Sequence, residues 1–217
     1  MHNFKPLPTP MVSSLQLTSD GSTTIFDPSF YRSIVGGLQY ITITRPELAY
    51  SSNKIYQYMP KPVKRILRYL QGTIDYGLYF KKSLHLILPA FSDSDQRFDP
   101  NDRKFIVGFC VYLGDNLISW CTRKQRVVSC SSIEVEFRSV AAITLELLWL
   151  QSLLSELKVP STIPKAYCDS LGMIMLVANP IMHSRSKHFK LNLYFVRDKV
   201  IKGVVQVIHL LAQFLGC

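Results

Sequence analysis

The sequence predicts an α/β fold: a mixed sheet with three antiparallel strands first, packed with helices and preceded by a small helical extension. Two patterns favour this fold. Apolar residues recur at helix spacing up to about residue 75, and strand-like runs alternate with predicted helices after residue 75. The composition allows a substantial core, since 47% of the 217 residues are hydrophobic and only 18% are charged. We therefore expect a folded chain rather than a disordered one.

The first part of the chain predicts an irregular lead-in followed by short helices. Residues 1–26 are rich in Pro, Ser and Thr, which favour loops. Residues 27–75 carry helical pieces, with a break at Thr44–Pro46. A short helix is expected in the stretch 62–73, because a proline stands at its start and Gly72 after its end.

The remainder, residues 76–210, predicts a sheet with helices. The expected strands are 76–80, 84–92, 105–114, 116–122, 165–169 and 204–210, and the expected helices are Ser132 to about Lys158, 171–179 and 186–203. Gly114–Asp115–Asn116 is typical of a hairpin turn. The long helix has one apolar stripe, formed by Ile133, Phe137, Val140, Thr144, Leu147, Leu150 and Leu154.

Composition also restricts the setting of the protein. The five cysteines are odd in number and include no C-x-x-C pair, which favours a reducing compartment over a disulfide framework. No apolar stretch reaches the ~18 residues of a membrane span, and the N-terminus has no signal-peptide core, so we expect an intracellular protein, cytoplasmic or nuclear. The net charge of +10 and a pI near 9.4 favour a polyanionic partner such as nucleic acid.

Two metal sites of other kinds are tested first. A calcium loop after Asp93 fails, because Arg97 and Phe98 stand where a ligand and a glycine are needed. A zinc site from Cys168, His183 and His188 matches no usual spacing. Buried thiols and surface histidines are the ordinary interpretation of those three residues.

A different set of acids suggests a site for a divalent cation. Asp93 and Asp169 each follow a predicted strand at its carboxyl end, where α/β sheets tend to place ligands. Glu134 completes a capping box that begins at Ser131, whereas Glu136 lies at the border of the apolar face without such a role. Two aspartates and Glu136 could converge on Mg²⁺, and capping, turn and surface roles for these acids remain the alternative from spacing alone.

The same residues carry a resemblance to a known family. The motifs "SDSD" (92–95), "IEVEF" (133–137) and "YCDS" (167–170) resemble, in order, those of the ribonuclease H domain of copia-type LTR retrotransposon Pol polyproteins. Upstream, "DPSFYRSIVGGLQYITITRPELAY" and "VKRILRYLQGTIDYGLYF" resemble the end of the reverse transcriptase of the same polyprotein. The resemblance covers about residues 8–210 and leaves 211–217 as a tail unlike the family.

The resemblance implies a ribonuclease H-like fold over 76–210 that cleaves the RNA strand of RNA–DNA hybrids with Mg²⁺ or Mn²⁺. It assigns catalytic and metal-binding roles to Asp93, Glu136 and Asp169, and it places Asn192 where the family has a fourth acid. Nucleic-acid-binding residues are expected among the basic positions Arg185, Lys187 and Lys190.

Departures from the family favour an impaired enzyme. Gln96, Arg97 and Phe98 replace a typical Trp-Ala-Gly segment, Asn192 removes one acid, and the catalytic aspartates of the reverse transcriptase are absent. Two hypotheses follow from this pattern. The domain is a nuclease that is weak, or it is a catalytically dead nucleic-acid-binding fragment or retrotransposon remnant with no activity.

Overall fold

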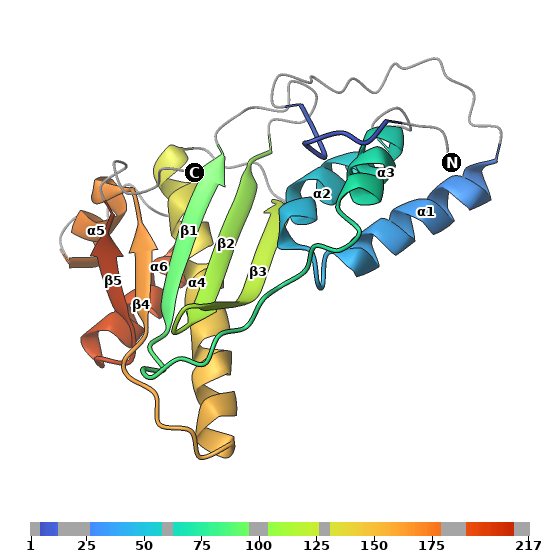
Figure 1. Ribbon diagram of the computed structural model, residues 1–217. Helices are drawn as coiled ribbons and strands as arrows, with labels where there is room; N and C mark the ends of the chain where they lie inside the picture. The colour runs from blue at the N-terminus through green and yellow to red at the C-terminus, as the bar shows by residue number, and fades with distance from the viewer. Residues whose placement is uncertain are drawn as a thin grey trace. The chain divides into compact units, whose positions relative to one another are not determined.

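The protein is described here by a computed structural model that covers residues 5–12, 27–57, 63–95, 104–125, 131–178 and 190–210 (Figure 1). The chain divides into two compact units, Met1–Tyr79 and Phe80–Cys217. Each unit has its own cluster of buried apolar residues, so each has a core of its own.

The first unit is helical. Its elements are α1 (Pro28–Ile41), the 3₁₀ turn η1 (Pro46–Leu48), α2 (Ala49–Gln57) and α3 (Val63–Gly72). The carboxylate of Asp27 caps α1 by accepting from the backbone N–H groups of Ser29 and Phe30. The break expected at Thr44–Pro46 is confirmed, because α1 ends at Ile41 and a 3₁₀ turn begins at Pro46.

The second unit is built on a five-stranded mixed sheet. Its strands are β1 (Pro89–Asp95), β2 (Ile106–Leu113), β3 (Asn116–Lys124), β4 (Lys165–Cys168) and β5 (Gln206–His209). They lie in the order β3-β2-β1-β4-β5. The first three pair antiparallel, whereas β4 pairs parallel with both β1 and β5. The expected mixed sheet with three antiparallel strands first is therefore confirmed.

Three helices accompany the sheet: α4 (Ser132–Glu156), α5 (Leu171–Ala178) and α6 (Lys190–Ile201). Side chains of α4 such as Ile143 and Leu147 pack on Leu88, Ala90 and Val111 of the sheet side. A second cluster joins α4, α5 and α6 to the end of β4. α4 is long and apolar enough to cross a membrane by length and composition, yet half of that window is buried inside the protein, as expected for a core helix.

Three expectations about the sequence pattern were wrong. Residues 76–80 form neither strand nor helix, and β1 begins at Pro89 rather than at residue 84. The segment before β1 is held by a side chain instead of a strand ladder, because the amide of Asn116 bonds both the N–H and the C=O of Lys81. Ile133 was expected in the buried stripe of the long helix, but it lies in the first turn and is 37% exposed.

The hairpin between β2 and β3 is confirmed at the predicted turn. Gly114 has φ of +60°, a left-handed conformation that side chains with a Cβ rarely adopt. A Cβ at this position would also clash with the side chain of Ser83. Glycine is therefore required here both by backbone conformation and by the close approach of the segment before β1.

Candidate active site

The two aspartates predicted at strand ends lie on neighbouring strands. β1 and β4 are parallel, with Phe91 opposite Tyr167, and the two rings stack with centroids 5.1 Å apart. Continuing this register by two residues brings Asp93 opposite Asp169, just past the end of β4. Both aspartates are exposed; Asp93 lies within β1, two residues before its end, and Asp169 directly follows β4.

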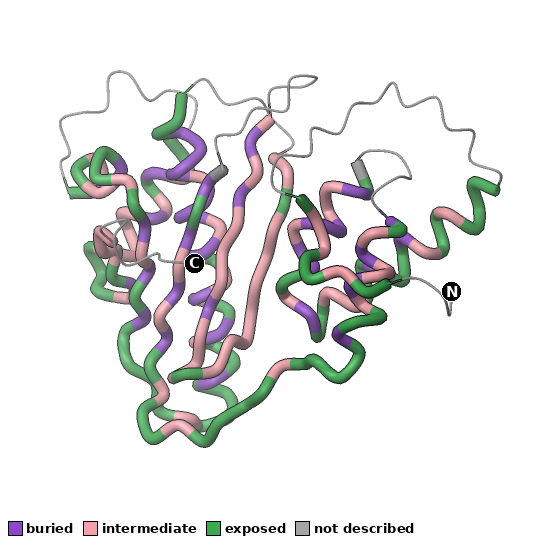
Figure 2. Tube along the Cα trace, turned by 45° about the horizontal axis from the view of Figure 1, so that its top comes forward, coloured by how far each residue is buried: buried purple, intermediate pink, exposed green. Residues whose placement is uncertain are grey.

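Glu136 lies in the first turns of α4. Along β1 buried and less buried positions alternate (Figure 2), so Ser94 faces α4 whereas Asp93 lies on the other side of the strand. The Ser94 hydroxyl donates to Glu136 Oε1 at 2.5 Å. Glu136 is only 7% exposed, and its second oxygen, Oε2, is buried without a hydrogen-bond partner. A buried carboxylate with an unsatisfied oxygen is costly and calls for an explanation.

The electrostatics connect the three carboxylates. Burial raises the pKa of Glu136, the hydrogen bond from Ser94 opposes that rise, and the charges of Asp169 and then Asp93 add to it. The two aspartates are therefore close enough to repel the Glu136 carboxylate. Such an arrangement is destabilising by itself and would be relieved by a positive charge.

Glu134, two residues earlier, has partners for both its backbone and its carboxylate. Its N–H donates to Ser131 Oγ at 3.2 Å, which confirms the N-cap predicted at Ser131. Its carboxylate accepts from Arg138 Nη2 at 2.5 Å, and the Glu134 side chain is 3% exposed. Of the two glutamates, Glu134 is thus satisfied by a structural pair and Glu136 is the one with an open oxygen.

Asn192, the fourth predicted position, lies near the three carboxylates in the fold but makes no hydrogen bond to them in the described residues. Asn192 lies in the first turn of α6 and is half-buried. Its neighbour Leu193 shares a buried cluster with Phe137, next to Glu136, and with Cys168, which precedes Asp169. Among the residues that the structure describes, Asn192 has no hydrogen bond to the three carboxylates. Of the basic positions, Lys190 is exposed at the start of α6, whereas Arg185 and Lys187 lie outside the described residues.

Two further side chains at the site were not anticipated. Ser94 could have been found from strand alternation, since it lies two positions after the buried Ser92 and four after the buried Ala90. His209 ends β5, and its Nε2 lies 3.1 Å from the backbone oxygen of Asp169. The rule that points to strand ends in α/β sheets applies to His209 as well.

The acidic residues have the chemistry of metal ligands but do not form a ready-made metal site in the described residues. Within the described ranges, no three His, Cys, Asp or Glu side chains form a group that could hold a metal ion as they stand. The chemistry still fits a hard divalent cation, because the charges of Asp169 and Asp93 act on the buried Glu136 carboxylate and Glu136 Oε2 has no donor of its own.

The structure does not support the alternative zinc and calcium sites. Cys168 is buried, and burial raises the pKa of its thiol to about 12, which disfavours the thiolate that zinc binds. His183 and His188 lie outside the described residues, as do Arg97 and Phe98 of the excluded calcium loop.

Comparisons with known proteins point to one group of relatives. No protein-family model matches the chain. It is 46% identical over 217 residues to the retrovirus-related Pol polyprotein from transposon RE2 of Arabidopsis thaliana, covering 96% of this chain and 15% of that protein. It is 44% identical to the Pol polyprotein from transposon RE1 of Arabidopsis thaliana, again over 96% of this chain and 15% of that protein. For the Pol polyprotein from transposon TNT 1-94 of Nicotiana tabacum, the identity is 30% over 97% of this chain and 17% of that protein.

The chain thus spans about one sixth of the length of these relatives. Among solved structures, it is similar to LC11-RNase H1 in complex with an RNA/DNA hybrid, with a TM-score of 0.44, 11% identity, and 59% of this chain and 88% of that chain covered. RNase H1 from Halobacterium salinarum gives a TM-score of 0.38 and 12% identity over 58% of this chain and 87% of that chain.

Proposed function

Because the chain belongs to the retrovirus-related Pol polyproteins of copia-type transposons, we propose that residues 76–210 are the ribonuclease H-like domain of such a polyprotein and cleave the RNA strand of RNA–DNA hybrids. Residues 27–75 are then the end of its reverse transcriptase. One observation carries the proposal: the Glu136 carboxylate is buried with an open oxygen and is repelled by two strand-end aspartates. A metal-dependent nuclease uses such a cluster, because a bound cation offsets the repulsion that the buried carboxylate experiences.

Each residue of the site has a separate task in this proposal. Asp93, Glu136 and Asp169 would hold Mg²⁺ or Mn²⁺, which when bound supplies an activated water and stabilises the leaving oxygen of the phosphodiester. Ser94 fixes Glu136 by bonding Oε1, so that Oε2 remains available. His209 lies against the backbone oxygen of Asp169 and supports the position of that residue at the end of β4.

The nucleic-acid partner is supported by charge. The chain carries a formal net charge of +10, and Lys190 is exposed at the start of α6, whose next turns pack beside the residues that adjoin Glu136 and Asp169. Basic side chains near acidic metal ligands bring phosphates to the site by neutralising the backbone of the substrate. We assign Lys190 to this role, together with Arg185 and Lys187, and we place the protein in the cytoplasm or nucleus, where such hybrids form.

The activity is proposed to be weak, because Asn192 replaces a fourth acid. Two divalent cations held close together repel each other, and each carboxylate offsets part of that repulsion. Losing one negative charge weakens the second cation most. The rival hypothesis is a domain that binds hybrids but cleaves none.

One experiment separates these functions. The purified chain is mixed with a labelled RNA–DNA hybrid in Mg²⁺ or Mn²⁺, and binding and cleavage are both measured. We expect weak cleavage that Asp93→Asn abolishes while leaving binding in place. Binding without cleavage in either metal would establish the dead binder instead, and absence of both would refute the proposed function.

A further inference from the structure

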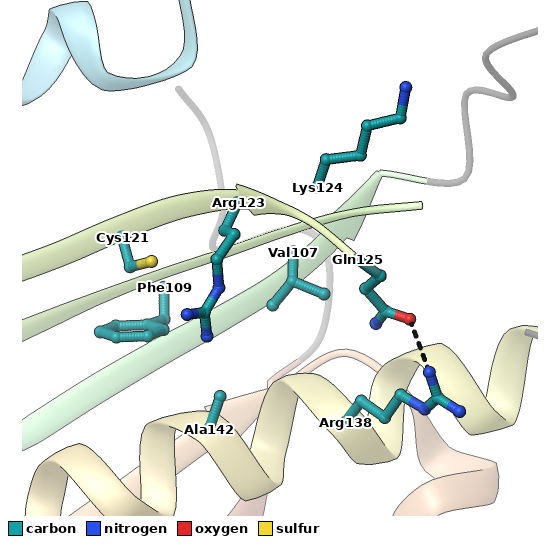
Figure 3. Close-up of a pocket in the computed structure, with 8 residues that line it drawn as sticks. All are labelled: Val107, Phe109, Cys121, Arg123, Lys124, Gln125, Arg138 and Ala142. Carbon is teal, nitrogen blue, oxygen red and sulfur yellow. Dashed lines mark hydrogen bonds between the residues drawn. The ribbon is translucent and has the colours of Figure 1, made fainter. Parts of the chain in front are cut away.

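A pocket of about 340 Å³ lies between the β2–β3 hairpin and α4 (Figure 3). It is lined by Val107, Phe109, Cys121, Arg123, Lys124, Gln125, Arg138 and Ala142. The register of the hairpin explains this lining, because Val107 pairs with Arg123 and Phe109 with Cys121, so these four side chains face α4 together. Its volume is at the lower end of the ~300–1,000 Å³ range of small-molecule sites.

The pocket shares no lining residue with the carboxylate cluster. Asp93 pairs with Gly108, which lies between Val107 and Phe109 on β2. Because neighbouring residues of a strand point to opposite faces, Asp93 and the pocket belong to opposite faces of the sheet. Neither Glu136 nor Asp169 lines the pocket either, so a ligand there would touch none of the three carboxylates.

The two arginines at the pocket differ in their partners. Arg138 is engaged, since it bonds the Glu134 carboxylate at 2.5 Å and the Gln125 side-chain oxygen at 3.4 Å. Within the described part of the chain, the side chain of Arg123 has no hydrogen bond or ion pair, and Figure 3 shows its guanidinium directed into the pocket between Phe109 and Ala142. The positive charge of Arg123 also lowers the pKa of the Cys121 thiol, against the larger effect of burial.

The remaining walls are apolar. Val107, Phe109 and Ala142 form a surface on which an aromatic ring can lie, and the ring of Phe109 is part of it. Lys124 contributes to the lining, but its ammonium points away from the pocket (Figure 3). An open guanidinium beside an apolar wall suits a ligand with an anionic group on an aromatic body.

We infer that this pocket binds a single nucleotide, with its phosphate on Arg123 and its base against Phe109. The guanidinium fork matches phosphate oxygens, and base–aromatic stacking is tolerant of sequence. The nucleotide is either free in solution or one unit of a nucleic-acid strand. This site goes beyond the proposed nuclease function and does not rest on it.

The test measures binding of a nucleoside 5′-monophosphate, of inorganic phosphate and of a short single-stranded oligonucleotide by calorimetry, with the metal chelated. Arg123→Gln should weaken nucleotide binding by about tenfold or more, as expected for loss of a charge-assisted bond. The matched control is Lys124→Gln, which removes the same charge one residue away and should change binding by less than about twofold. Phe109→Leu should weaken the nucleotide but leave inorganic phosphate unchanged.

A second readout reports the location directly. Bound nucleotide should slow alkylation of Cys121. The rate is measured by peptide mass spectrometry and compared with the rate for the same protein without ligand. Cys110 pairs with Trp120 on β3, faces away from α4, and serves as the internal control. Protection by the monophosphate supports a free nucleotide, and protection only by the oligonucleotide supports a unit of a strand.

Three results would overturn the inference. They are equal losses in Arg123→Gln and Lys124→Gln, phosphate binding as tight as nucleotide binding, and nucleotide binding without protection of Cys121. Because the metal is chelated and Asp93 is untouched, failure of this site leaves the hybrid-cleavage test unaffected.

Discussion

Replacing Glu136 by glutamine should make the protein more stable near neutral pH while removing a proposed metal ligand. Glu136 is 7% exposed, is repelled by Asp169 and Asp93, and keeps one oxygen without a partner. The net effect of these terms is a raised pKa even with the bond from Ser94 included, so folding favours the protonated form. A neutral glutamine retains an acceptor for Ser94 without the charge. We expect Glu136→Gln to raise the free energy of unfolding by about 0.5–2 kcal/mol, the usual gain when a strained functional residue is relieved.

The gain should depend on pH in a defined direction. In the unfolded chain Glu136 ionises near its ordinary pKa of 4.5, and in the folded chain it ionises at higher pH. Below pH 4.5 the residue is protonated in both states, so the wild type suffers no penalty. As the pH rises through the raised pKa, the wild type loses stability and the variant does not. The difference between them should therefore be near zero under acid conditions and full at neutral pH.

Urea unfolding followed by circular dichroism, with the metal chelated, measures this difference. Glu134→Gln is the matched control, because Glu134 lies two residues away and is also buried but pairs with Arg138. It should destabilise by about 1–3 kcal/mol, since Arg138 would lose its carboxylate partner. Two results would refute the account of Glu136 as an uncompensated buried charge. One is a lower free energy of unfolding for Glu136→Gln at neutral pH, and the other is an equal gain in the free energy of unfolding in acid. Adding Mg²⁺ should reduce the advantage of the variant, because the cation binds only the wild type well.

Three further predictions follow from the site and the fold. Asn192→Asp should increase cleavage of an RNA–DNA hybrid, more in Mg²⁺ than in Mn²⁺; indifference to this change in a chain that cleaves robustly would contradict the impaired site. Gly114→Ala should destabilise the protein by about 1–3 kcal/mol in thermal or urea unfolding, because its φ is +60° and the new Cβ meets Ser83. Cys168 should react with alkylating reagents far more slowly than Cys110 near neutral pH, since its pKa is about 12 and it is buried; equal rates by mass spectrometry would show that the end of β4 is open.

Features that depend on nearby residues were predictable from the sequence. The Ser131 cap is set by residues within one helical turn, and the hairpin at Gly114 by the turn itself, so both were placed correctly. Residues 76–80 were mistaken for a strand because aromatic residues favour sheets, yet a strand needs a partner. Tyr79 and Phe80 are 80% and 62% exposed, and no strand pairs with them in the part of the chain that the structure describes.

Features that depend on residues far apart in the sequence were not predictable from it. Ser94 meets Glu136 across 42 positions of sequence, and the open guanidinium of Arg123 is defined only once α4 packs beside the hairpin. Local sequence patterns carry no information about such long-range side-chain contacts. The preference for Glu136 over Glu134 rested on a local argument, namely that one of the two had a capping role and the other had none; the cap is confirmed, and the metal-binding role of Glu136 stays a prediction.

The order of the strands has a consequence for how the protein folds. The hairpin of β2 and β3 and its pairing with β1 join residues close in sequence, whereas β1 meets β4 through contacts such as that of Ser92 with Tyr167, which are 75 positions apart. Closing a loop of that length is slow, so the antiparallel half is expected to form first and the parallel half later. Asp93 and Glu136 are in place before Asp169 joins them. The three carboxylates therefore come together only once β4 has joined β1, late in the folding of this unit.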